Sequence, residues 1–282
     1  MTSHCPAGRY HERPNMLDNH FTLKKRLVDG QTLSGLFVSE FRSPNMGLIL
    51  NAAGFDFAII DMEHGAFALS DLSAMVPNFR MLKTQPLVRI PTVNRNYIQP
   101  LLDLGVAGLV IPMTEDPADV RRCVEMMKYP PDGRRGMSFC CPHGGFIPRD
   151  QDEYIRQANG NLLLVAMIET VRGIENLDAI LDVPGLDVVM VGNCDLAISM
   201  GQKNDLTVGP VRDAMRYVLQ TAAAKGVFGG GNFADPELVA EFLDLGLRFI
   251  TLSSEVDRLG RCLRNAKQTL ERTLQGLPKL QA

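Results

Sequence analysis

The stretch LLLVAMI at residues 162–168 is an unbroken apolar run that ends at Glu169 and Thr170. A run of strand length without polar residues is typical of a strand buried on both faces, as in a parallel sheet. Seven further runs are apolar almost throughout. Together the eight predicted strands cover residues 33–39, 55–61, 87–90, 108–112, 162–168, 187–191, 227–230 and 249–252.

Amphipathic stretches separate the strands and predict helices at residues 45–53, 69–82, 97–104, 117–127, 171–181, 211–224, 236–245 and 256–274. Asp116-Pro117 and Asp235-Pro236 are start signals, and Gly105 and Gly246 are stop signals. Eight strands alternating with eight helices over about 250 residues predict a (β/α)8 TIM barrel. A doubly wound open sheet is the alternative, but the sequence lacks the GxGxxG signature after its first strand.

The composition narrows the function classes. In 282 residues, 29 Lys and Arg against 32 Asp and Glu give a net charge of −3, which offers no electrostatic footprint for nucleic acid. No apolar run approaches the ~20 residues of a membrane span. Residues 1–22 lack a signal-peptide core, so we expect a flexible tail on a cytoplasmic protein whose residues 23–282 form one domain. Six scattered cysteines without a CxxC pair predict reduced thiols and no structural zinc.

Catalytic groups of a barrel lie where strands end and the following loops begin. Residues 129–150, the one long stretch without predicted structure, are expected to cover this mouth. Polar side chains occupy or follow several of the predicted strands, and a charge there needs a partner or a metal because its desolvation costs several kcal/mol. The candidates are Asp61, Glu63, His64, Arg89, Glu169 and Asp195, with Asp103 at the end of the helix after the third strand.

Glu169 and Asp195 follow adjacent predicted strands, which places two carboxylates near each other at the mouth. Two carboxylates with positions left open for water and substrate suit a hard divalent cation such as Mg²⁺ or Mn²⁺, with Co²⁺ a further option. The spacing is equally compatible with a salt bridge from one of them to Arg89, or with a helix cap. The residues alone leave both interpretations open.

His64 is the candidate base, because a neutral imidazole accepts a proton near pH 7. Arg89 stands inside an apolar strand, and its fork of donors suits a substrate carboxylate or an enolate oxygen. The structural alternatives are a histidine satisfied by its surroundings, and an ion pair of Arg89 with Asp61, Glu63 or Glu169.

Six segments resemble, in order and spacing, the HpcH/HpaI metal-dependent pyruvate aldolases, which are related to the citrate lyase beta chain. The similarity runs from about residue 23 to about residue 270. The segments are FDFAIIDMEHG (55–65), PLVRIP (86–91), LLDLGVAGLVIPM (101–113), KYPPDGRRGMS (128–138), AMIETVRGIENLDAIL (166–181) and VVMVGNCDLAISMG (188–201).

The resemblance implies a TIM barrel of the phosphoenolpyruvate/pyruvate-binding type with an extra C-terminal helix. It implies that Glu169 and Asp195 hold a divalent metal, that His64 is the base with Asp103 raising its basicity, and that Arg89 stabilises a pyruvate enolate. It also implies a homohexamer, a trimer of dimers, in which the helix at 256–274 is exchanged between subunits.

Two positions depart from the pattern that the resemblance implies. Met167 replaces a glutamine two residues before Glu169, and a thioether is at most a weak hydrogen-bond acceptor. The usual Gly-Pro-x-Asp-Leu of the sixth strand is Gly192-Asn193-Cys194-Asp195-Leu196 here. Met167, Gly192, Asn193 and Cys194, together with Arg89, are therefore the expected substrate-binding positions, at which substrate identity would be decided.

The expected function is a class II aldolase that cleaves a 4-hydroxy-2-oxo acid into an aldehyde and pyruvate through a metal-bound pyruvate enolate. No lysine lies within the predicted strands, which agrees with a mechanism without a Schiff base. One alternative is an oxaloacetate-decarboxylating enzyme similar to macrophomate synthase. Another is a non-catalytic barrel that binds a small acid.

Overall fold

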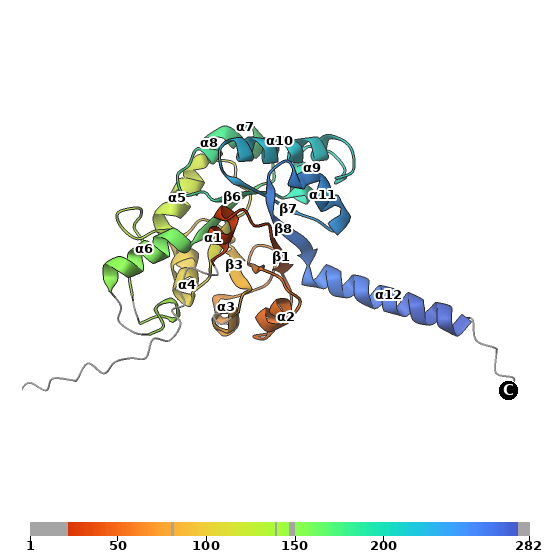
Figure 1. Cartoon of the computed structure of the whole chain (residues 1–282), viewed down its shortest axis with the longest axis horizontal. Coiled ribbons are helices and arrows are strands. Elements are labelled where there is room, and N and C mark those ends of the chain that lie inside the picture. The colour runs from red at the N-terminus through yellow and green to blue at the C-terminus, as the bar shows by residue number, and fades with distance from the viewer. Residues whose placement is uncertain (1–21, 80–81, 139, 147–149, 276–282) are drawn as a thin grey trace, which may run out of the picture.

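The computed structural model describes residues 22–79, 82–138, 140–146 and 150–275. Within them, eight parallel strands close into a barrel in the order β1 to β8, with helices around the outside (Figure 1). The (β/α)8 expectation is confirmed. The strands are β1 (Leu33–Val38), β2 (Phe57–Asp61), β3 (Gln85–Arg89), β4 (Gly108–Ile111), β5 (Leu163–Ile168), β6 (Val188–Val191), β7 (Phe228–Asn232) and β8 (Leu247–Ser254).

The register of neighbouring strands brings the candidate residues to one end of the barrel. Asp61 at the end of β2 pairs with Arg89 at the end of β3. Ile168 of β5 pairs with Val191 of β6, so Glu169 and Gly192 leave the barrel side by side. Because all strands are parallel, these carboxyl ends meet at the same mouth.

The barrel interior is filled by apolar side chains, as the strand pattern requires. Phe57 and Phe249 stack with ring centroids 4.0 Å apart. Gly35 of β1 lies against the Phe57 ring, where a β-carbon would overlap it. At the amino-terminal end of the barrel, Leu23 and Leu27 of α1 (Leu23–Val28) are buried in this same cluster. That short helix closes the bottom and leaves the opposite end for chemistry.

A second, larger cluster fills the space between the strands and the surrounding helices. The remaining helices are α2 (Met46–Ala52), α3 (Leu69–Met75), α4 (Arg95–Leu104), α5 (Pro117–Met127), α6 (Gln151–Asn161), α7 (Val171–Glu175), α8 (Leu177–Leu181), α9 (Asn193–Ser199), α10 (Pro210–Ala224), α11 (Val239–Leu243) and α12 (Glu255–Gln275). The described ranges also contain three short 3-10 helices: η2 (Val76–Phe79), η3 (Pro142–Gly144) and η4 (Pro236–Leu238).

The helices differ from the sequence prediction in a few places. The predicted helix at 171–181 is split into α7 and α8 at Asn176, whose backbone is not helical and whose side chain donates to the Glu115 carbonyl at 2.8 Å. Short helices α1 and α9, and the eleven-residue α6, were not predicted. Each helix depends on tertiary packing for its stability, which short-range patterns do not report.

The sequence predicted that residues 129–150 cover the mouth of the barrel. The described part of this stretch does not do so. Gly136 donates to the Gln99 side chain at 3.2 Å, and η3 packs on α4. Arg135 bonds to Asp103 in the last turn of α4, close to where the chain enters β4. This stretch therefore packs against α4 toward the amino-terminal end of the barrel.

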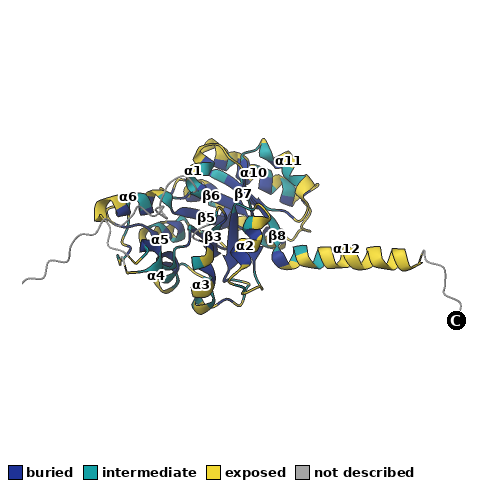
Figure 2. Cartoon of the chain, turned by 60° about the horizontal axis from the view of Figure 1, so that its bottom comes forward, coloured by how far each residue is buried: buried dark blue, intermediate teal, exposed yellow. Residues whose placement is uncertain are grey.

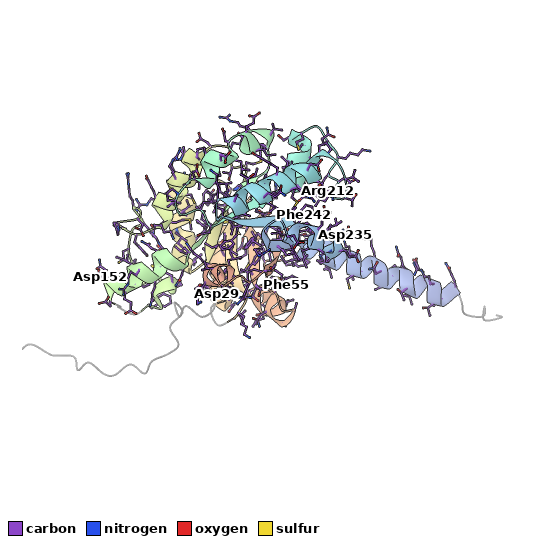
Figure 3. All side chains as sticks on the ribbon, turned by 45° about the horizontal axis from the view of Figure 1, so that its top comes forward. Asp29, Phe55, Asp152, Arg212, Asp235 and Phe242 are labelled. Atoms are coloured by element: carbon purple, nitrogen blue, oxygen red, sulfur yellow. The ribbon has the colours of Figure 1, made fainter. Side chains whose placement is uncertain are left out.

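The last helix, α12, extends away from the barrel as a rod (Figure 1), and most of it is exposed (Figure 2). Figure 3 shows its side chains projecting clear of the other elements. Leu259, Leu263 and Leu270 are among its exposed apolar residues. Among the described residues, no helix has both the length and the apolar character needed to cross a bilayer.

Candidate active site

Arg89 is held rigidly at the barrel mouth. Its Nε donates to Asp61 Oδ1 at 2.9 Å, and its Nη2 donates to the other oxygen of the same carboxylate. The guanidinium carbon lies 5.0 Å from the centre of the Phe37 ring. Burial is the largest single influence and opposes the charge of Arg89, but the hydrogen bonds and charge of Asp61 together with the charges of Glu63 and Glu169 outweigh it and raise the pKa of the guanidinium. Arg89 is thus a fixed cation with one terminal nitrogen, Nη1, directed elsewhere.

That nitrogen faces Glu63 and Met167. Nη1 lies 3.1 Å from Glu63 Oε2 and donates to Met167 Sδ at 3.9 Å. Met167 is only 3% exposed, so its thioether occupies the place against the guanidinium where the resemblance implies an amide. A thioether is a weak acceptor, which leaves Nη1 less satisfied than an amide oxygen would.

Glu169 is almost fully buried, with an exposed fraction of 2%. Its Oε1 accepts a hydrogen bond from the backbone N–H of Met113 at 2.8 Å. Its carboxylate lies directly over Gly192, where a β-carbon would overlap it. Burial raises the pKa of Glu169 to about 7, and the charges of Glu63 and Asp195 act in the same direction. The site therefore has an excess of negative charge that a cation would relieve.

Asp195 lies in the first turn of α9 and is partly exposed. Together with Glu169 it offers carboxylate oxygens, the ligands preferred by Mg²⁺ and Mn²⁺. No cluster of three or more His, Cys, Asp or Glu with metal-binding geometry occurs in the described ranges. The two carboxylates of Glu169 and Asp195, of which Glu169 is buried and repelled by its acidic neighbours, fit a divalent cation whose other ligands are water and substrate.

His64 and Glu63 lie in the loop that follows β2. The loop is fixed by Asp61 Oδ1, which accepts from the backbone N–H groups of both residues, at 3.0 Å from Glu63 and 3.3 Å from His64. The His64 side chain is 63% exposed, with its Nε2 3.9 Å from Glu63 Oε2. Burial raises the pKa of Glu63. An exposed imidazole at the mouth is free to meet a substrate.

Asp103 is the one predicted site residue that the structure does not bring to this mouth. It lies in the last turn of α4, where Gln99 donates to both its carboxylate oxygens at 3.0 and 2.9 Å and Arg135 donates to one of them at 2.9 Å. His64, by contrast, follows β2 at the carboxyl end. Within one copy of the chain, the His64–Asp103 pair that the resemblance implies is not formed among the described residues.

Asn193 and Cys194 begin α9, directly after Gly192. The Asn193 side chain donates to Asn204 at 3.0 Å, and the Asn204 side chain donates to the Cys194 thiol at 3.2 Å. The pKa of Cys194 is raised, chiefly by burial and by the Asp195 charge. Asn204 was not predicted, because it lies in an irregular loop with no motif to mark it. Phe37 was also missed, since an aromatic in a buried strand carries no signal of contact with Arg89.

Comparison with known proteins shows the family to which the chain belongs. A family model described as HpcH/HpaI aldolase/citrate lyase matches residues 33–261. The hydroxypyruvate/pyruvate aldolase of Roseovarius nubinhibens is 33% identical over 249 residues, which are 88% of this chain and 95% of that protein. The crystal structure of an HpcH/HpaI aldolase from Desulfitobacterium hafniense has a TM-score of 0.84 at 29% identity, and the match covers 93% of this chain and 100% of that chain. Macrophomate synthase has a TM-score of 0.79 at 26% identity, with 90% of each chain covered.

Proposed function

Because the chain belongs to the HpcH/HpaI aldolase/citrate lyase family, we propose that it is a carbon–carbon lyase that cleaves a 4-hydroxy-2-oxo acid into pyruvate and an aldehyde. The observation that carries this proposal is the buried Glu169 carboxylate, whose pKa is raised to about 7, beside Asp195 at the mouth that also holds Arg89. The Arg89 guanidinium is a fixed positive charge at the same end of the barrel as the Glu169 and Asp195 carboxylates. This combination, with a divalent cation held by the carboxylates, suits a substrate that develops negative charge on oxygen.

Glu169 and Asp195 are the residues that would hold a divalent cation, with Mg²⁺ and Mn²⁺ the first choices. Such a cation, when bound, supplies positive charge that polarises the oxo acid and stabilises the negative charge that develops on it. The remaining roles belong to side chains of the chain itself.

In the proposed reaction His64 accepts the proton of the substrate's 4-hydroxyl group. The O–H electron pair forms the aldehyde carbonyl, the C3–C4 bond breaks, and its electron pair forms the C2–C3 double bond of the pyruvate enolate. Negative charge then rests on the C2 oxygen, which Arg89 stabilises from its fixed position on Asp61. Protonation of C3 gives the methyl group of pyruvate.

The relative from Roseovarius nubinhibens is named for hydroxypyruvate and pyruvate. The structural similarity to macrophomate synthase favours a second candidate, in which the same enolate arises by decarboxylation of oxaloacetate. The two are separated by their reactants, because a decarboxylase releases CO₂ from oxaloacetate alone whereas an aldolase needs the aldehyde for the reverse reaction.

Deuterium exchange into the methyl group of pyruvate, followed by NMR, tests enolate formation without knowledge of the aldehyde. We expect exchange with Mg²⁺ or Mn²⁺, suppression by EDTA, and loss in Glu169→Ala and Arg89→Ala. Lys203→Ala, an exposed change in the loop after α9, serves as the control. Failure of the wild-type protein to exchange with any divalent cation would contradict pyruvate enolisation and favour a barrel that only binds a small acid.

A further inference from the structure

The side chain of Asn204 contacts Asn193 and Cys194, the two residues in the turn from Gly192 to Asp195. Asn204 Oδ1 accepts from the side-chain amide of Asn193 at 3.0 Å, and Asn204 Nδ2 donates to Cys194 Sγ at 3.2 Å. One carboxamide thus contacts both residues between Gly192 and Asp195. The contact joins the start of α9 to the loop at residues 200–209.

The two asparagines differ in burial, so the loss of their hydrogen bond would affect them differently. Asn193 is buried, with an exposed fraction of 8%, while Asn204 is exposed. The loop is itself attached to α9 by the Gln202 N–H, which donates to the Ala197 carbonyl at 2.8 Å, and by the buried Leu206. Loss of the Asn204 side chain would leave a buried donor of Asn193 without this partner, which is costly for a buried amide, whereas the loop would keep its other contacts.

The start of α9 needs such a restraint. Its N-cap is Gly192, which carries no side chain to cap the helix and has φ −88° and ψ 83°. Gly192 cannot be replaced by a stiffer residue, because Glu169 occupies the space over it. Proline at position 193, as in the motif that the sequence resembles, would fix φ near −65° at the first helical position. Asparagine lacks that covalent restraint.

We propose that Asn204 is a positioning residue that replaces this restraint by fixing Asn193 and Cys194 through its carboxamide. It thereby keeps the turn from Gly192 to Asp195 in its observed conformation, with Gly192 under the Glu169 carboxylate and Asp195 in the first turn of α9. The proposal rests on the proposed function in one respect, namely that this turn receives the oxo acid and its cation.

Two measurements on Asn204→Ala test the proposal. In the metal-free protein, amide hydrogen exchange of residues 193–199 should accelerate about tenfold, because the helix start opens more often without its two hydrogen bonds. In the pyruvate exchange assay with Mn²⁺, KM should rise about tenfold while kcat changes by less than about twofold, as for lost ground-state positioning. Lys203→Ala, from the same exposed loop, should change neither quantity.

The effect of Asn204→Ala is also measured in a variant that does not need the Asn204 contacts. In Asn193→Pro combined with Cys194→Ala, proline at the first helical position supplies the restraint, so adding Asn204→Ala should alter amide exchange and KM by less than about twofold. An equal effect of Asn204→Ala in both backgrounds would overturn the proposal. So would unchanged amide exchange in the metal-free protein.

The two proposals fail in different ways. If wild-type protein does not exchange pyruvate with any cation, the proposed function is wrong, while the amide exchange of residues 193–199 still decides whether Asn204 restrains the turn. If wild-type protein exchanges pyruvate and Asn204→Ala accelerates amide exchange without raising KM, the function stands and the positioning role is overturned.

Discussion

The carboxylate of Glu169 lies in the space that a side chain at Gly192 would fill, so the end of β5 and the turn after β6 fit together only with glycine at position 192. The backbone N–H of Met113, after β4, fixes the same carboxylate from the other side at 2.8 Å. A candidate metal ligand is therefore positioned by backbone from both neighbouring strands. Changes to that backbone should alter the site before they alter the fold.

Gly192→Ala is expected to displace the Glu169 carboxylate and to reduce pyruvate exchange by about a hundredfold or more, since small misplacements at a reacting centre are that costly. Overpacking should also lower the free energy of unfolding by about 1–3 kcal/mol. Mn²⁺ affinity measured by electron paramagnetic resonance should fall in parallel. Gly160→Ala is the matched control, because a β-carbon there, in α6, meets nothing within 4 Å. Unchanged Mn²⁺ affinity in Gly192→Ala would contradict the assignment of Glu169 as a ligand.

The stability of the metal-free protein should depend on pH through Glu169. Burial raises the pKa of this carboxyl from its ordinary 4.5 to about 7, so between these pH values the folded protein holds a proton that the unfolded chain releases. The free energy of unfolding should therefore fall as pH rises through this window, by on the order of 3 kcal/mol in total. Below about pH 4.5 the carboxyl is protonated in both states and the penalty disappears.

Urea unfolding of wild type and Glu169→Gln, at pH 5 and pH 8 without metal, measures this dependence. The glutamine variant should lose the part of the slope that belongs to Glu169, and saturating Mn²⁺ should abolish it in the wild type because the cation favours the ionised carboxylate. Identical slopes for both proteins would show that Glu169 is ionised normally.

Met167→Gln is expected to lower the KM for pyruvate by about threefold to tenfold. The amide oxygen would accept from Arg89 Nη1, which Met167 Sδ contacts at 3.9 Å, and the amide NH₂ would donate toward the substrate. The energy corresponds to about one net hydrogen bond. Met167→Leu, which keeps the volume and removes the sulfur, should leave KM close to that of the wild type. A rise of KM in Met167→Gln would indicate that the apolar side chain itself selects the substrate.

Asp103 could assist His64 only from another copy of the chain, because α4 holds it away from the mouth of its own barrel. We therefore expect His64→Ala and Asp103→Asn, each inactive alone, to regain activity when unfolded and refolded together. Random assembly of equal amounts pairs a wild-type His64 with a wild-type Asp103 in about a quarter of the sites. No recovery, although the variants co-assemble, would mean that Asp103 serves only the packing against Arg135.

The exposed face of α12 is expected to bury itself against other copies in a homo-oligomer. Val256, Leu259, Leu263 and Leu270 are exposed and recur at the spacing of one helical face. Leu263→Glu combined with Leu270→Glu should reduce the molar mass of the assembled protein in size-exclusion chromatography with light scattering. Each substitution would place a charge in the expected apolar contact between copies, where its burial is costly. Asn265→Glu lies on the opposite face of the helix and should leave the mass unchanged. A wild-type monomer would contradict the expectation directly.

The sequence by itself determined the barrel, because buried strands and amphipathic helices repeat with different periods along the chain. The run at 162–168 became β5 almost to the residue, with Glu169 directly after it. The same logic singled out Arg89 as a candidate, since a charge that ends an apolar strand is visible in the sequence as an exception to the pattern. Asp195, also a candidate from the sequence, lies in the first turn of α9, four residues after the end of β6. Residues 1–21, predicted as part of a flexible tail, lie outside the described residues.

Only the tertiary structure decided which of these residues meet. The choice of Asp61 as the bidentate partner of Arg89 depends on the register of β2 against β3, which local pattern does not encode. The separation of Asp103 from His64 depends on the direction in which α4 runs back along the barrel. The contact of Asn204 with Asn193 and Cys194 joins a loop to a turn eleven residues away, and such contacts arise from packing in three dimensions rather than from periodicity.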